Sequence, residues 1–402
     1  MNGVTRTTII ALASILASGL FGCIQPASAT VSPICNEYDM KGKYERLSVE
    51  RVWVYQPKGN WSYSHHPNII WFKDYFIVMW SNGRVDEDQP GQRVMTARSA
   101  DFRHWTKPEV LVDSQPGVDA EAALAAGGFY QHHGALVAYI PQWEYKPEAL
   151  ENGKVHVLGK SHTRFRLRAI TSTDGKTWSR LRDIALPAGP SQPPRPIKSG
   201  RLIIAGSVSF PYSDDPSGLA GWKMTGIYPS GMSVSTADDF PSESEIQKLQ
   251  GWPNMLCEGS FYQTDDSVIH MLLRSNTEWL WVTESRDNGA TWSAPVRTSF
   301  SDNATKFQFG RLPDGRFYYV GCPSPEPRWV RTPLVLSLSE DGVRFTKHYI
   351  IADEPYKMKY PAHYKGGEYG YPSTVVRDGY LYVVISRQKE AVEVIRAAIP
   401  HR

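Results

Sequence analysis

Short runs of apolar or alternating residues recur along the chain, and residues that favour tight turns separate them. Such runs occupy residues 69–72, 75–80, 135–140, 201–205, 316–320 and 380–385. Lys73-Asp74, Pro313-Asp314-Gly315 and Arg377-Asp378-Gly379 each lie between two apolar runs. These turn residues tolerate the backbone angles that a hairpin requires. Long helical periodicity is absent outside residues 242–249, so the sequence predicts an all-β protein.

A serine, aspartate and aromatic pattern returns four times between these runs. Its fullest copy is Ser285-Arg-Asp-Asn-Gly-Ala-Thr-Trp292, and shorter or degenerate copies begin at Ser99, Ser172 and Ser339. The spacings of 73, 113 and 54 residues between successive serines fit a unit near 54, with residues 145–160 as an insertion. Residues 30–402 would hold about seven units of roughly 50 residues, a length typical of four-stranded propeller blades. The sequence therefore predicts one seven-bladed β-propeller domain, with six blades as the alternative.

The N-terminal segment has the pattern of an export signal. Arg6 is followed by an uncharged, apolar or small stretch over residues 7–22. Ala27-Ser28-Ala29 has the small-x-small form of a cleavage site, which predicts a signal peptide at 1–29 and a secreted or periplasmic protein. Leu20-Phe21-Gly22-Cys23 resembles a lipoprotein box, so anchoring at Cys23 is the alternative.

Composition narrows the range of partners. The net charge of +3 and the pI near 8.5 favour an anionic over a cationic substrate. No lysine or arginine run is dense enough to indicate nucleic-acid binding, and no other segment reaches the roughly 20 apolar residues of a membrane-spanning helix. Cys35, Cys257 and Cys322 remain after signal cleavage, so at most one disulfide can form within the chain. The oligomeric state stays open.

The repeated pattern resembles the Asp-box of sialidase-type β-propellers, S-x-D-x-G-x-x-W, which lies on a hairpin between the outer strands of a blade. Its aspartate would cap a turn and its aromatic ring would pack between sheets, so the box marks the fold and performs no chemistry. Glu258 and Arg274 resemble the sialidase arrangement of a glutamate opening one strand and an arginine closing the next, and Arg331 is a second such arginine. Their guanidinium groups could bind a substrate carboxylate, or Glu258 and Arg274 could form a structural ion pair.

A second resemblance concerns histidines and a tyrosine. The segments Ser64-His65-His66-Pro67, Gln131-His132-His133-Gly134, Ser161-His162-Thr163 and Phe210-Pro211-Tyr212 are together similar to the seven-bladed ulvan lyases and related rhamnosidases and rhamnosyl-glucuronate lyases. This resemblance implies an acid/base role for His133 or His132, for His162 and for Tyr212. The cation that neutralises the uronate would come from Lys223, Arg274 or Arg331. His66 and Glu258 are further predicted substrate-binding residues.

These residues suit β-elimination, in which a base removes the proton α to a uronate carboxylate while a cation neutralises that carboxylate. We therefore predict a secreted lyase acting on an anionic, rhamnose-rich, ulvan-like polysaccharide. The first alternative is an exo-glycosidase, either an α-L-rhamnosidase or a sialidase. A sialidase would need a tyrosine nucleophile activated by a glutamate, three carboxylate-binding arginines and an acidic proton donor, of which the sequence offers Glu258, Arg274 and Arg331.

The last alternative is a non-catalytic glycan-binding propeller with Trp61, Trp143 and Trp222 as a sugar platform. Catalysis by any of these routes is expected to need no cofactor. A structural zinc or calcium ion is a weaker hypothesis, for which the candidate zinc ligands are Cys257, Cys322, His270 and His363. No C-x-x-C spacing supports that set, and metal content stays open.

Overall fold

The computed structural model describes residues 31–155, 162–186, 188–227, 252 and 256–402. The predicted signal peptide, Cys23 and residues 242–249 lie outside this part of the chain. Within the described residues, no helix has the length and apolar character needed to cross a bilayer. No disulfide joins Cys35, Cys257 or Cys322.

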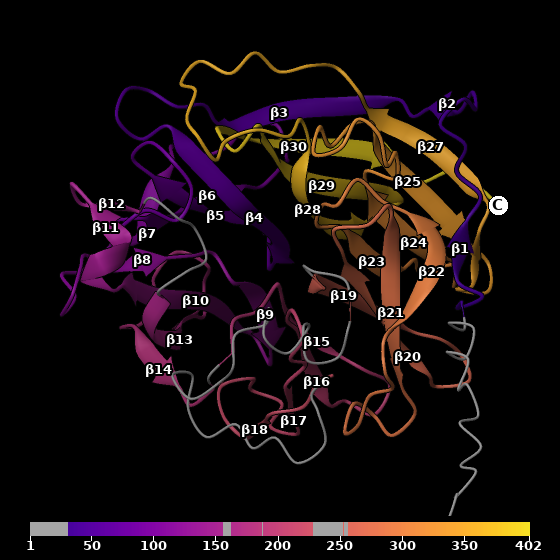
Figure 1. Cartoon of the computed structure of the whole chain (residues 1–402), viewed down its shortest axis with the longest axis horizontal. Helices are drawn as coiled ribbons and strands as arrows, with labels where there is room; N and C mark the ends of the chain where they lie inside the picture. Colours follow the sequence, from indigo (N-terminus) through magenta and orange to yellow (C-terminus); the bar gives the residue numbers. More distant parts are fainter. Residues whose placement is uncertain (1–30, 156–161, 187, 228–251, 253–255) are drawn as a thin grey trace, which may run out of the picture. The chain divides into compact units, whose positions relative to one another are not determined.

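The described chain is almost entirely β-structure (Figure 1). The first sheet contains β4 (Tyr63–Phe72), β5 (Tyr75–Gly83), β6 (Arg93–Ser99) and β7 (Glu109–Val112). The second contains β9 (Gly128–His132), β10 (Ala135–Tyr145), β13 (His162–Ser172) and β14 (Arg182–Ile184), with β8 (Ala123–Leu124) also paired to β10. The third contains β15 (Gln192–Pro196), β16 (Leu202–Ala205), β17 (Tyr212–Ser213) and β18 (Trp222–Lys223).

Three further sheets follow in the second half of the chain. The fourth contains β19 (Cys257–Gln263), β20 (Ile269–Arg274), β21 (Trp279–Ser285) and β22 (Val296–Ser301), extended by β1 (Cys35–Asn36) and β26 (Arg344–Phe345). The fifth contains β23 (Gln308–Arg311), β24 (Phe317–Gly321), β25 (Leu334–Ser339), β27 (Lys347–Ala352) and β2 (Glu45–Arg46). The sixth contains β28 (Gly370–Arg377), β29 (Tyr380–Arg387), β30 (Ala391–Ala398) and β3 (Val49–Tyr55). A short hairpin of β11 (Leu150–Glu151) and β12 (Lys154–Val155) follows the 3₁₀ turn η1 (Pro147–Ala149).

The six sheets form a closed ring. Their innermost strands β4, β9, β15, β19, β23 and β28 contact one another in this order, and β28 contacts β4. Figure 1 shows the labels of these strands gathered around the centre of the arrangement. The all-β propeller prediction is thus supported, but no seventh sheet of four strands occurs among the described residues. The prediction of seven blades is not confirmed, and the six-bladed alternative fits the sheets described.

An early strand and the last strand of the described chain meet in the sixth sheet. Strand β3, near the N-terminus, pairs antiparallel with β30 from Val49↔Ala397 to Tyr55↔Val392. Apolar side chains of this sheet then pack against the first sheet, where Val384 and Val394 belong to one buried cluster with Trp80. The sheet that closes the ring is therefore assembled from segments distant in sequence.

The Asp-box turns are structural, as the sequence predicted. Ser285 Oγ donates to Asp287 Oδ1 at 2.8 Å, and the same carboxylate oxygen accepts the Thr291 N–H at 2.9 Å. Gly289 has a φ of +81°, and a Cβ there would lie 2.7 Å from Cδ1 of Ile203 on the preceding sheet. Glycine is required both by this backbone conformation and by the close approach of the two sheets.

We expect removal of residues 391–402 to abolish cooperative unfolding. The deletion takes away β30, so both β29 and β3 lose a pairing partner and the ring opens. Circular dichroism during heating is the measurement. Deletion of the exposed residues 401–402 alone is the matched control and should melt like the parent. A sharp melting transition in the longer deletion would show that closure is not needed.

Candidate active site

Buried and half-buried polar side chains gather at the end of the ring where the innermost strands begin. They come from the first, fourth, fifth and sixth sheets. The members are His65, His66, Glu87, Asp88, Glu258, Arg274, Lys306, Arg331, Tyr371 and Lys389. Most of them lie near the start of an innermost strand, at the end of the strand paired with it, or just outside these strands. Ring closure therefore brings them together.

Three members lie on β-bulges and have an unusual backbone conformation. His66, Glu258 and Tyr371 have φ values of 52°, 50° and 55°. Each lies where the pairing register of β4, β19 or β28 shifts. The left-handed conformation costs a non-glycine residue roughly 1–2 kcal/mol, and bulges beside active sites commonly redirect a side chain. The same unfavourable backbone conformation at the starts of three strands indicates a functional constraint on where these side chains lie.

Tyr371, Glu258 and Arg274 form a hydrogen-bonded triad. The Tyr371 hydroxyl donates to Oε1 of Glu258, and Nη1 of Arg274 donates to Oε2. Arg274 Nη1 also lies 3.4 Å from the Tyr371 hydroxyl oxygen. Tyr371 is 8% exposed and Arg274 is 5% exposed. The ion pair considered from sequence is therefore present, but its carboxylate also holds a tyrosine that sequence reasoning did not identify.

The charges of the cluster decide which groups are ionised. Burial disfavours ionised Glu258, yet Arg274, Lys306 and the Tyr371 hydroxyl together lower its pKa to about 2. Burial, together with the Glu258 charge, raises the pKa of Tyr371 well above 10. Burial lowers the pKa of Lys306 to about 8, against the opposing effect of Glu258. At neutral pH the resting site therefore holds a glutamate anion and a protonated tyrosine.

The cluster offers unused donors to an anion. Arg331 is 5% exposed, and its Nε and Nη1 have no hydrogen-bond partner among the described residues; Nε of Arg274 likewise has none. The Arg331 guanidinium lies 5.4 Å from the centre of the Tyr371 ring, and Lys306 Nζ lies 5.0 Å from it. Buried guanidinium donors of this kind suit a carboxylate, whose oxygens can accept two parallel hydrogen bonds.

The cluster opens into surface pockets. Arg331 and Lys389 line a pocket of about 190 Å³ together with Trp329 and Tyr364. Tyr364 also lines a larger hollow of about 780 Å³, whose other walls include residues 84–86 and 152–155. A small anionic group could enter beside Arg331 while a larger attached group occupied the adjoining hollow.

A carboxyl group with an elevated pKa lies on the loop after β5. Burial and the neighbouring Glu87 charge raise the pKa of Asp88 to about 7. Gln92 Nε2 donates to Asp88 Oδ1 at 3.2 Å. Glu258 also contributes to the raised pKa, because its negative charge interacts with Asp88. Asp88 is thus a carboxyl group that can still carry a proton near neutral pH.

The structure does not bring the predicted histidine pair into this cluster. His132 ends β9 and stacks on Tyr130, while His133 is exposed in the hairpin turn before β10. The corresponding turn of the first sheet contains Lys73, whose ammonium donates to the carbonyl of Thr173 in an Asp-box. His132 and His133 therefore lie toward the Asp-box end of the strands, whereas the cluster lies at the opposite end.

The remaining predicted acid/base residues are not members of the cluster, but His162 lies at the same end of the ring, because burial and then the charge of Asp88 raise the pKa of Tyr145, its hydrogen-bond partner. His162 begins β13, where its Nε2 is 3.0 Å from the Tyr145 hydroxyl. The Tyr212 ring lies beside Arg201 at 4.0 Å and Lys223 at 5.7 Å. Arg201 also donates to the Asn288 carbonyl in an Asp-box, which places this group at that end of the sheet. Of the predicted site residues, the structure gathers His66, Glu258, Arg274 and Arg331.

The predicted metal ligands do not assemble. Cys257, Cys322, His270 and His363 form no group of three potential ligands in the part of the chain that is described. His270 instead contacts Glu284, with Nδ1 3.0 Å from Oε1.

A sequence signal for the missed tyrosine does exist. His66-Pro67 and Tyr371-Pro372 each combine a bulge residue with a proline inside an innermost strand. Proline cannot donate to a strand ladder and within sheets is largely confined to edges, first residues and bulges. A proline in these apolar runs therefore marks the bulge and the residue that it redirects.

The ring of sheets with repeated Asp-box turns defines this chain as a β-propeller of the sialidase-like type. The chain belongs to the family of BNR repeat-like domains, which matches residues 74–383. No curated protein matches the chain in sequence. The relationship to ulvan lyases and rhamnosidases is not confirmed by these comparisons.

Solved structures share this fold at low sequence identity. A sialidase superposes with a TM-score of 0.57 and 19% identity over 89% of this chain and 33% of the other. Trypanosoma rangeli sialidase in complex with sialic acid gives 0.60 and 13% over 88% and 59%. A protein of unknown function from Dyadobacter fermentans DSM 18053 gives 0.56 and 17% over 87% and 99%. The chain thus spans a third to three fifths of those sialidases, and the likeness establishes the fold alone.

We expect Gly370→Ala to disturb the cluster. A Cβ at residue 370 would lie 2.6 Å from Oγ of Ser386 and 2.9 Å from Cε1 of His65. Overpacking costs about 1–3 kcal/mol, so the melting temperature should fall by a few degrees. Gly189→Ala is the control, since its Cβ would meet only the Phe165 ring, at 3.2 Å. Equal melting of both variants would contradict tight packing at residue 370.

Proposed function

We propose that this protein is a glycosidase that removes an anionic sugar residue with retention of configuration, using Tyr371 as nucleophile. The observation that carries the proposal is the Tyr371–Glu258 hydrogen bond inside a buried cluster of cations. Sialidases are the glycosidases that use a tyrosine in this role. The pair meets the requirement named from sequence for a tyrosine activated by a glutamate.

The first step forms a covalent intermediate. The Tyr371 oxygen bonds to the anomeric carbon as the bond from that carbon to the leaving oxygen breaks. The tyrosine proton moves to Glu258, and Asp88 gives its own proton to the leaving oxygen. In the enzyme without substrate, the pKa of Glu258 is about 2. We therefore expect proton transfer to accompany bond formation rather than precede it.

The second step restores the enzyme. A water molecule attacks the anomeric carbon, Asp88 takes its proton, and the bond to Tyr371 breaks. The tyrosine oxygen then recovers its proton from Glu258. Two displacements at one carbon return the original configuration, and both carboxyl groups end in their starting protonation states.

A carboxylated sugar suits the charges around these groups. Arg331 and Arg274 have unused donors, and Lys306 adds a third positive charge near Tyr371. A neutral tyrosine can approach a sugar whose carboxylate lies close to the reacting carbon, whereas a carboxylate nucleophile would be repelled. The binding of that anion would offset the cations that depress the pKa of Glu258, so the substrate itself would make Glu258 a stronger base.

The described cluster differs from the sialidase pattern of three carboxylate-binding arginines. Two arginines contribute to the described cluster, and His65 and His66 occupy the start of β4. The identity of the acidic sugar therefore needs a panel of sialosides, uronides and other carboxylated glycosides. Ulvan belongs in the same panel, because an unsaturated product absorbing in the ultraviolet would favour the lyase prediction.

We expect Tyr371→Phe to lower kcat by on the order of a thousandfold or more, because the nucleophilic oxygen is lost. Reducing-sugar release on the best substrate of the panel is the measurement. The melting temperature should stay close to that of the parent. Tyr130→Phe removes a hydroxyl that donates to the Pro216 carbonyl away from the cluster, and it serves as the control.

The lyase prediction gives the opposite pattern. If Tyr212→Phe removed activity while Tyr371→Phe retained it, elimination would replace hydrolysis as the reaction. Retained activity in both variants would exclude either tyrosine as an essential group.

We expect hydrolysis to be fastest in mildly acidic solution and to decline as the pH rises through about 7 to 8. Asp88 must hold its proton, which is lost above its raised pKa of about 7, and Lys306 loses its charge above about 8. Glu258 stays ionised down to about pH 2, so it sets no limit near neutrality. A pH profile of kcat/KM tests this. A rate that climbed into alkaline solution would instead match a neutral histidine base.

A further inference from the structure

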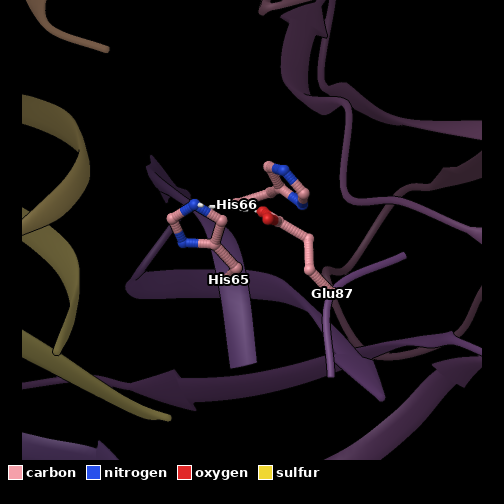
Figure 2. Close-up of side chains that lie close together, drawn as sticks. All are labelled: His65, His66 and Glu87. Atoms are coloured by element: carbon pink, nitrogen blue, oxygen red, sulfur yellow. Dashed lines mark ion pairs between the residues drawn. The ribbon is translucent and has the colours of Figure 1, made fainter. Parts of the chain in front are cut away.

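Two histidines and a glutamate converge at the edge of the cluster without a part in the reaction above. His65 and His66 lie in β4, and Glu87 lies on the loop after β5. One ligand atom from each of the three residues lies within 4.8 Å of the others. Figure 2 shows the Glu87 carboxylate between the two imidazole rings.

The hydrogen bonds of His65 are compatible with a lone pair on Nε2, the ring nitrogen on the side of this carboxylate. Nδ1 of His65 is 2.6 Å from Oγ of Ser386, and that hydroxyl donates to the Gly370 carbonyl. Metal binding at Nε2 requires the tautomer in which Nδ1 carries the proton and Oγ accepts it, and donation from Oγ to the Gly370 carbonyl is compatible with that tautomer. His65 is fully buried, and its Nε2 has no hydrogen-bond partner among the described residues.

Nε2 of His65 and a carboxylate oxygen of Glu87 face each other across a gap that a positive species could occupy. Nε2 of His65 lies 4.0 Å from Oε1 of Glu87. With the His65 proton on Nδ1, Nε2 is an acceptor without a hydrogen-bond partner among the described residues, and it faces Oε1 of Glu87, an acceptor that already receives the Tyr63 hydroxyl at 3.5 Å. A metal ion between Nε2 of His65 and Oε1 of Glu87 would be bound by both atoms.

The second histidine is held in the same way. Nδ1 of His66 is 3.0 Å from Oγ of Ser81. Burial, followed by the charge of Lys306, lowers the pKa of His66 to about 3, so its ring is neutral at pH 7. Metal-binding histidines characteristically engage their other ring nitrogen in a hydrogen bond that fixes the ring orientation. Ser386 and Ser81 provide this support to His65 and His66.

The geometry points to a divalent ion of the zinc class bound by Nε2 of His65, a ring nitrogen of His66 and Oε1 of Glu87. Two imidazoles and one carboxylate are ligands that zinc favours, and three protein ligands leave a coordination position open. Zinc bonds of about 2.0–2.2 Å would require the three side chains to close in by on the order of 1 Å. That movement lies within the reach of side-chain rotation.

Nearby cations set a condition on the bound ion. Lys389 Nζ lies 2.5 Å from Oε2 of Glu87, so the metal would bind Oε1, which also accepts the Tyr63 hydroxyl at 3.5 Å. Lys306 and Arg331 also oppose a further positive charge. An anion in the open position would offset this repulsion. If the proposed function holds, that anion is the substrate carboxylate; the metal site itself does not depend on it.

Zinc titration of chelator-washed full-length protein tests the site. Calorimetry and elemental analysis after gel filtration should give one Zn²⁺ per chain, and zinc should raise the melting temperature. His66→Gln and Glu87→Gln should each weaken binding at least tenfold. Without zinc, His66→Gln should melt near the parent, whereas Glu87→Gln should melt lower because Lys389 loses its carboxylate partner. Absence of binding to the parent protein would overturn the proposal.

The matched control is the double variant His132→Gln, His133→Gln. This second adjacent pair has ring centres 3.9 Å apart and could capture zinc at the surface. It lies outside the cluster, so the double variant should retain one zinc of unchanged affinity. Loss of the ion in the control, with retention in His66→Gln, would assign the binding to the exposed pair and refute the site proposed here. Because the readout is metal content, a protein inactive on every glycoside could still confirm the metal site.

Discussion

Closure of the ring is the constraint on which the rest of the structure depends. Each sheet buries its faces against its neighbours, and the sixth sheet is complete only when β3 pairs with β30. The starts of β4, β19 and β28 then lie around one end of the ring. Tyr371, Glu258 and His66 are far apart in sequence, so their meeting is a consequence of closure rather than of any local motif.

The rigid ring holds positively charged side chains close together, although they repel one another. Lys306, Arg274 and Arg331 are all buried, and Glu258 is the nearby anion that hydrogen-bonds to Arg274. Burial of a charge is costly unless partners compensate it. An anionic ligand would therefore stabilise a cluster rich in cations. This imbalance is a stronger indication of substrate charge than the mild net charge of the whole chain.

The sequence predicted the framework better than the site. The Asp-box copies at Ser99, Ser172, Ser285 and Ser339 carry local turn chemistry, which a short stretch of sequence encodes. The blade number depended instead on dividing the length by an average unit, and long segments such as 353–369 between β27 and β28 consume residues without adding a sheet. Spacing arithmetic cannot separate such loops from a further blade.

The site residues divide in a similar way. Glu258 and Arg274 were predicted from their resemblance to a sialidase arrangement, and the structure places them on adjacent strands of one hairpin, where pairing of Cys257 with Arg274 brings them close. Tyr371 is one of 21 tyrosines, and its role depends on a bulge and on contact with the fourth sheet across the ring. His132 and His133 had the expected chemistry, but a position at the end rather than the start of β9 directs them away from the cluster.

The two histidines at the start of β4 raise the question of how this site would supply positive charge to the anionic substrate proposed above. Lys306 can do so only while protonated, and burial lowers its pKa to about 8. A metal ion held by His65, His66 and Glu87 would keep its charge well above that pH, because its ligands need only remain deprotonated. Lys306 therefore loses its positive charge in alkaline solution, whereas the metal site would lose its ion in acid, where its ligands become protonated. Neutral histidines beside a lysine of lowered pKa would allow one pocket to retain a cation for its substrate on both sides of neutrality.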